Sequence, residues 1–231
     1  MKVTAIETVR VEDVPNLVWV IVTTDEGLSG LGESYFDPVV TETHVHEHIA
    51  PYLLGRPALR IEEHHHNLVG YLGQHGSGAA QRARGMVDIA LWDILGKAAN
   101  LPLCDLLGGP VRDSVPIYNT CAGRSYNIRP NAREASFDHG LTEEDAVYED
   151  TTAFLTRPVA LAESLLAMNI TGMKIWPFDF LPEARHGEIP SVESMKKAVW
   201  PFAEIRKALG DRIDLMCELH GLWSVPAARQ I

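Results

Sequence analysis

The 231-residue sequence predicts an α+β domain over residues 1–112, followed by an α/β barrel of the TIM-like (β/α)8 type over residues 113–231. Three observations support this fold class: strand-like alternation over residues 2–33, helical spacing of apolar side chains over residues 80–99, and alternating strands and helices after Gly109. A barrel of this type closes with eight βα units, and the sequence contains about the first three. We therefore expect an incomplete barrel.

Three strands begin the α+β domain. Residues 2–11 and 16–24 are predicted strands, the second rich in β-branched side chains. Residues 25–27 form the turn into a short third strand near residues 28–33, which gives an antiparallel meander. Within it, Gly30-Leu31-Gly32 lacks the third glycine and the helix of a dinucleotide-binding motif, so we expect a tight turn there.

Three helices are expected to follow the meander. One begins after Asp37, where Pro38 suits a first helical position, a second covers about 61–73, and the longest covers about 80–99. In the longest helix, apolar side chains spaced three or four residues apart predict one broad buried face. The members of this face are Ala83, Met86, Val87, Ala90, Leu91, Ile94, Leu95 and Ala98.

Strands and helices alternate in the second domain, as is typical of a parallel sheet with crossover helices. The expected strands are residues 115–120, 172–176 and 213–219, and the expected helices are about 158–168 and 191–209. Residues 123–156 are too long for an ordinary connection. They are expected to form either a substrate-contacting lid or a plain mobile insertion.

Charge and composition exclude several classes of function. The net charge of −11, without clustered Lys and Arg, argues against binding to nucleic acid or to an anionic membrane. No apolar run approaches the roughly 20 residues of a membrane span. Three separated cysteines, Cys104, Cys121 and Cys217, fit reduced thiols. We therefore expect a cytoplasmic protein whose partner is a small molecule.

Charged and aromatic side chains lie at the ends of two predicted strands. Lys174 and Trp176 share one face of their strand, and Glu218 and His220 share one face of the next, because side chains alternate along a strand. Barrel active sites form at this end of the strands, and a carboxylate there suits a hard cation such as Mg²⁺. Taken singly, each residue has an ordinary structural role. Their convergence favours a functional site.

A long motif in the first domain carries a family resemblance. The run ARGMVDIALWDILGK at residues 83–97, continued by residues 101–109, resembles the N-terminal signature of the mandelate racemase/muconate lactonizing group of the enolase superfamily. Lys174 and Glu218 fall where that group carries its strand-2 lysine and its first metal-binding acid. The resemblance implies a capping domain over a (β/α) barrel, one Mg²⁺ held by three carboxylates, and removal of the proton α to a substrate carboxylate.

Two departures from the group's pattern refine the expected reaction. Racemases and cycloisomerases of the group typically have Lys-x-Lys on strand 2, whereas Trp176 cannot accept a proton. Lys174 is therefore expected to contact the substrate carboxylate or enediolate, and the base to lie beyond residue 231. His220, two residues after Glu218, resembles the acid-sugar dehydratases related to mannonate and galactonate dehydratase. Its imidazolium would protonate the departing β-hydroxyl.

The resemblance thus implies a Mg²⁺-dependent lyase that removes water from an aldonate or aldarate sugar acid. Its expected site residues are Lys174 and His220 for catalysis, Glu218 for the metal, and Trp176, Arg124 and Tyr35 for substrate binding. A racemase or epimerase of the same group is the alternative enzyme. A truncated or binding homologue without catalysis is the other alternative, expected if the intact chain ends at Ile231. A homo-oligomer is also expected.

Overall fold

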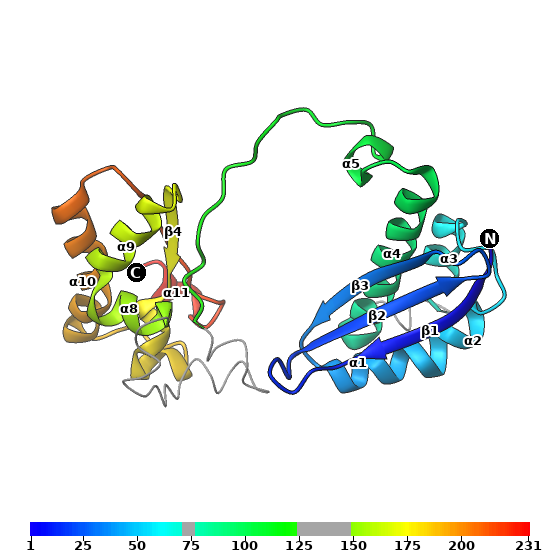
Figure 1. Ribbon diagram of the computed structural model, residues 1–231. Helices are drawn as coiled ribbons and strands as arrows, with labels where there is room; N and C mark the ends of the chain where they lie inside the picture. Colours follow the sequence, from blue (N-terminus) through cyan, green and yellow to red (C-terminus); the bar gives the residue numbers. More distant parts are fainter. Residues whose placement is uncertain (71–76, 124–148) are drawn as a thin grey trace. The chain divides into compact units, whose positions relative to one another are not determined.

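The computed structural model describes residues 1–70, 77–123 and 149–231. The chain folds as two compact units, Met1–Asp113 and Ser114–Ile231, which divide next to the boundary expected at residue 112 (Figure 1). Each unit has a buried apolar core of its own.

An antiparallel meander forms the sheet of the first unit. Its strands β1 (Val3–Val9), β2 (Leu17–Thr24) and β3 (Ser29–Tyr35) pair in the order β1-β2-β3. Every second side chain of β2 is buried, with Val18, Val20 and Val22 fully enclosed. The alternation seen in the sequence therefore marks a core face, and the predicted meander is confirmed.

The helices of the first unit follow the sheet in sequence. They are α1 (Pro38–His44), the π-helical η1 (Val45–Ile49), α2 (Ala50–Leu53), α3 (Ile61–Asn67), α4 (Gly78–Ala99) and α5 (Leu103–Leu106). The long helix α4 lies across the sheet, and Met86, Ala90 and Ile94 on its inner face are buried (Figure 1). The first and third predicted helices are confirmed, although Ala98, at the end of the predicted apolar face, is exposed. The helix predicted at about 61–73 is confirmed only as far as Asn67, and residues 71–76 lie outside the described part of the chain.

Two glycines allow β3 to touch the backbone of α4. A Cβ atom added to Gly32 would lie 1.8 Å from the Met86 carbonyl oxygen, and one added to Gly30 would lie 1.9 Å from that of Ala90. Neither position has room for any side chain. The tight turn expected here is therefore wrong: the segment is a strand, and its glycines serve close approach between backbones.

Side chains of α4 also satisfy the free edge of β3. The Leu31 N–H donates to Asp93 Oδ2 at 2.9 Å, and Lys97 Nζ donates to the Ser29 carbonyl oxygen and to Asp93 Oδ2, both at 2.7 Å. Partial burial alone would raise the pKa of Asp93, but the hydrogen bonds from Lys97 and from the Leu31 N–H outweigh it and lower that pKa below its usual range. Edge groups satisfied in this way are closed to pairing with another chain.

The lowered pKa of Asp93 predicts a pH-dependent contribution to stability. A carboxyl whose pKa is lowered by folding stabilises the fold above its unfolded pKa, and this contribution is lost as pH falls through the folded pKa. We expect Asp93→Asn to lower the unfolding temperature near neutral pH, with the difference from wild type shrinking below about pH 4. Thermal unfolding at both pH values measures this. The same substitution at Asp13, an exposed aspartate of the same unit, is the control and should change the unfolding temperature little.

The second unit contains a parallel strand pair with helices around it. Its elements are α8 (Asp150–Thr156), α9 (Pro158–Ala167), β4 (Gly172–Ile175), the 3₁₀ helices η4 (Pro177–Phe180) and η5 (Pro182–Arg185), α10 (Val192–Leu209), β5 (Asp214–Cys217) and α11 (Val225–Ala228). Strands β4 and β5 pair in parallel, and α10 connects them as a crossover helix. The strands and helices predicted beyond residue 157 are confirmed.

Two expectations for this unit are wrong. The strand expected at residues 115–120 is reduced to one parallel bridge between Asn119 and Met173. Val115 and Ile117 are 69% and 65% exposed, so no packing surface holds that segment extended as a strand. The long connection expected at residues 123–156 ends earlier, because α8 occupies its last part; residues 124–148 lie outside the described part of the chain.

The three cysteines are free thiols, as expected from their spacing. Burial raises the pKa of Cys121 to about 12, so its thiol is protonated at neutral pH and behaves as a small apolar side chain. Among the described helices, none combines the length and the apolar character needed to cross a membrane.

Candidate active site

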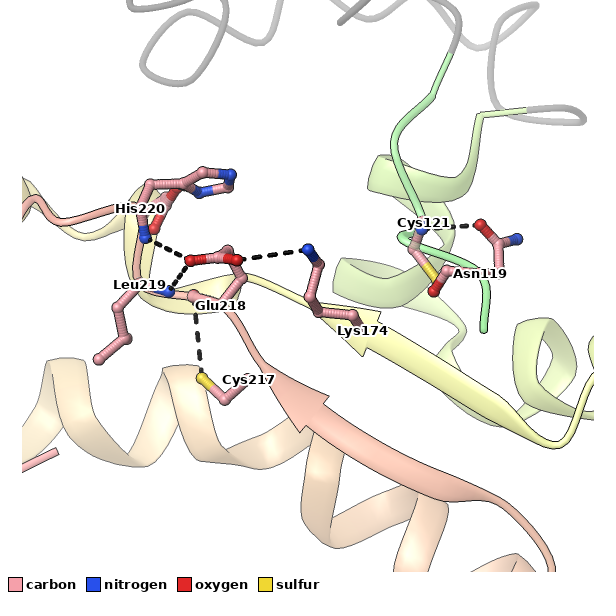
Figure 2. Close-up of polar contacts among 8 residues, drawn as sticks. Asn119, Cys121, Lys174, Cys217, Glu218, Leu219 and His220 are labelled. Atoms are coloured by element: carbon pink, nitrogen blue, oxygen red, sulfur yellow. Dashed lines mark hydrogen bonds and ion pairs between the residues drawn. The ribbon is translucent and has the colours of Figure 1, made fainter. Parts of the chain in front are cut away.

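The ends of β4 and β5 bring Lys174 and Glu218 together. Lys174 pairs with Met216 in the parallel register, and Glu218 directly follows β5. Lys174 Nζ lies 3.3 Å from Glu218 Oε2, with the two side chains 21% and 33% exposed (Figure 2). The sequence predicted that these residues converge, and the structure places them in contact at the same end of the parallel pair.

The other oxygen of Glu218 is held by the backbone that follows it. Glu218 Oε1 accepts hydrogen bonds from the N–H groups of Leu219 at 3.0 Å and His220 at 2.9 Å (Figure 2). His220 and Gly221 have φ values of 46° and 66°, so the chain turns through the left-handed region here. The His220 N–H, aided by Lys174, holds the pKa of Glu218 below its usual range. The carboxylate is therefore ionised at neutral pH, the form that binds a cation.

His220 forms an ion pair with a carboxylate that the sequence prediction missed. Its Nδ1 lies 2.6 Å from Oδ2 of Asp179, a residue of η4 whose side chain is 0% exposed. The hydrogen bond to Asp179 raises the pKa of His220, and burial raises the pKa of Asp179. The imidazolium of His220 is therefore stabilised toward higher pH than that of a solvated histidine, as a general acid near neutrality requires.

A sequence signal for Asp179 existed. It is an acid within the otherwise apolar run Trp176-Pro177-Phe178-Asp179-Phe180, immediately past the end of β4.

The sequence prediction also missed Tyr118. The centroid of its ring lies 5.5 Å from Lys174 Nζ, at cation–π distance.

The predicted substrate-binding residues have different positions. Trp176 is 3% exposed and packs edge-on against His220, with ring centroids 5.4 Å apart, and against Phe154 at 5.5 Å. Tyr35 ends β3 in the first unit, where its ring centroid lies 4.0 Å from that of Phe36. Arg124 lies outside the described residues. Substrate contact by all three stays a prediction.

The donor set at the strand ends suits a hard divalent cation. Mg²⁺ is usually bound through one or two carboxylates together with water and substrate oxygens. Glu218 offers one ionised carboxylate, oriented by two backbone hydrogen bonds. Within residues 1–70, 77–123 and 149–231, no group of three acidic, histidine or cysteine side chains is close enough to hold a metal. Binding of a metal by Glu218 therefore stays a prediction, with Glu218 as the candidate ligand at this end of the strand pair.

Comparison with known proteins identifies the family. Residues 2–108 match the model for the N-terminal domain of the mandelate racemase/muconate lactonizing enzyme family. A solved Agrobacterium tumefaciens enolase of the mandelate racemase subgroup is 43% identical, with a TM-score of 0.79 over 99% of this chain and 54% of its own. An enolase from Sargasso Sea environmental sequencing is 38% identical, with a TM-score of 0.80 over 100% of this chain and 54% of its own. The chain is a member of the enolase superfamily.

Within that superfamily, the chain resembles acid-sugar dehydratases. A D-galactonate dehydratase of Xanthomonas oryzae is 28% identical over 100% of this chain and 51% of its own length. A D-mannonate dehydratase of Rhizorhabdus wittichii is 36% identical over 54% of this chain and 31% of its own length. The chain therefore spans about half the length, or less, of these curated relatives.

Proposed function

We propose that the protein is a Mg²⁺-dependent dehydratase that removes water from an aldonate or aldarate sugar acid. One observation carries the proposal: a histidine held by a buried carboxylate lies beside a lysine–glutamate pair at the ends of adjacent parallel strands. The likeness to D-galactonate and D-mannonate dehydratases supports the same reaction class. In this proposal the β4–β5 pair belongs to a (β/α)8 barrel, and the first unit is its capping domain.

The reaction begins with loss of the proton α to the substrate carboxylate. A general base takes this proton, and the electron pair moves into the carboxylate to give an enediolate. The Lys174 ammonium, positioned at 3.3 Å from Glu218 Oε2, stabilises the negative charge that develops. Mg²⁺, when bound with Glu218 as one ligand, would supply further positive charge.

Water then leaves from the β-carbon. The electron pair of the enediolate forms the Cα–Cβ double bond as the C–O bond to the β-hydroxyl breaks. His220 donates its Nε2 proton to the departing oxygen, because hydroxide leaves poorly without a general acid. The product enol tautomerises to a 2-keto-3-deoxy acid.

A substrate panel tests the proposal. The intact polypeptide is incubated with a broad set of aldonates and aldarates plus Mg²⁺, and 2-keto-3-deoxy acids are measured. We expect product from at least one sugar acid and loss of product when the metal is chelated. No product across the panel, from a protein of the length of the curated relatives, would overturn the proposal.

Two further measurements separate the alternatives. Deuterium exchange at the α-carbon without keto product would favour a racemase or epimerase. An intact mass near 25.5 kDa, the mass of these 231 residues, would favour a homologue without catalysis. A homo-oligomer and a cytoplasmic location are part of the proposal. Light scattering and cell fractionation check them.

A further inference from the structure

We propose that Asp179 is a positioning residue that holds the His220 imidazole in one orientation and makes Nε2 the nitrogen that serves the substrate. The inference rests on the proposed function, in which His220 is the general acid. It adds a second residue, 41 positions away in the sequence, to the acid half of the reaction.

The contact is short and the carboxylate is fully enclosed. Asp179 Oδ2 lies 2.6 Å from His220 Nδ1, and the Asp179 side chain is 0% exposed. Within the described residues, Asp179 Oδ1 has no hydrogen-bond partner, so the bond to His220 is the contact that compensates the buried carboxylate. A buried charge left without its partner is strongly destabilising. Asp179 therefore stays bonded to His220 rather than turning to water.

Two further features restrict the imidazole. The Trp176 ring packs against it in a T-shaped arrangement at 73°, and the left-handed φ of 46° sets the direction in which the side chain leaves the backbone. Asp179 and Trp176 both come from the segment that directly follows β4. The segment after β4 thus positions the side chain of His220, which lies in the turn after β5.

The hydrogen bond between His220 Nδ1 and Asp179 decides which of the two imidazole protons can be given to the substrate. When Asp179 is ionised its oxygens only accept, and Nδ1 of His220 is then the donor to Oδ2 across the 2.6 Å contact. The imidazolium then gives its Nε2 proton to the departing oxygen and remains as the Nδ1–H tautomer. The alternative is that Asp179 only links η4 to the turn after β5. Removing its carboxylate would then change the stability of the unit but would not change which nitrogen of His220 carries the hydrogen.

Nitrogen NMR of the intact protein tests this assignment. With ¹⁵N-labelled histidine, the His220 signals are identified by their absence in His220→Gln. We expect the neutral imidazole of the wild type to be the Nδ1–H tautomer, and Asp179→Asn to shift it toward Nε2–H, because the amide N–H can donate to Nδ1. The expected kinetic result is a fall in kcat of about 10- to 100-fold with KM nearly unchanged. Asp214→Asn, an exposed change in β5, is the control and should alter neither.

The outcomes separate this inference from the proposed function. A wild type with the Nε2–H tautomer overturns the inference without any variant, even where Asp179→Asn fails to fold. An unchanged tautomer and an unchanged kcat in Asp179→Asn also overturn it while leaving dehydration intact. If no sugar acid turns over, the proposed function fails, and the tautomer still reports whether Asp179 orients His220.

Discussion

Replacing Lys174 with methionine is expected to lower the kcat for sugar-acid dehydration by about 10²- to 10³-fold, the loss typical of removing one charge-stabilising donor. The Lys174 side chain is 21% exposed, and its ammonium nitrogen lies 3.3 Å from Glu218 Oε2. Methionine keeps an apolar stem of similar length but carries no charge. The enediolate would therefore lose stabilisation while the packing around β4 is retained. Steady-state kinetics with the sugar acid found in the panel measures this loss.

A matched substitution separates the site from general effects of removing a lysine. Lys196→Met changes an exposed lysine on α10 and should leave kcat at the wild-type value. Glu218 keeps its two backbone hydrogen bonds when Lys174 is replaced, so its carboxylate stays oriented. If Lys174→Met retains more than about a tenth of wild-type kcat, Lys174 does not stabilise the transition state in the way proposed.

The periodic spacing of apolar side chains predicted the strands and helices that bury one face against the core. Side chains of β2 alternate between core and outer face, and the inner residues of α4 recur at helical spacing, so both elements could be predicted from sequence alone. The convergence of Lys174 and Glu218 followed from a simple topological rule, because the carboxyl ends of neighbouring parallel strands meet at one edge.

Features that depend on tertiary contact could not be predicted in this way. Gly30 and Gly32 resembled a turn because the sequence does not record that α4 crosses the strand at these positions. Asp179 acquires its role only when η4 packs against the turn after β5. Residues 115–120 were predicted to form a strand, but Val115 and Ile117 are exposed, and strand propensity without a packing surface does not form a strand.

Replacing Gly32 with alanine is expected to destabilise the first unit by about 3 kcal/mol, at the upper end of overpacking costs. The added Cβ would lie 1.8 Å from the Met86 carbonyl oxygen and 2.8 Å from the Met86 carbonyl carbon. Both are backbone atoms of a long helix, so no side chain can rotate to make room. Either α4 moves away from β3 or the pairing of β3 with β2 is disturbed, and both expose core side chains such as Val20.

Amide hydrogen exchange of β2 measures this effect within the first unit, because the two units can unfold separately. The matched control is Gly85→Ala. Gly85 lies within α4, and a Cβ atom added there would have no atom within 4 Å. It should stabilise the helix by about 0.5–1 kcal/mol, because alanine loses less backbone entropy than glycine. Opposite signs for the same substitution would show that contact between β3 and α4, rather than glycine itself, sets the stability. Equal effects at both positions would contradict this account of how the sheet and helix are joined.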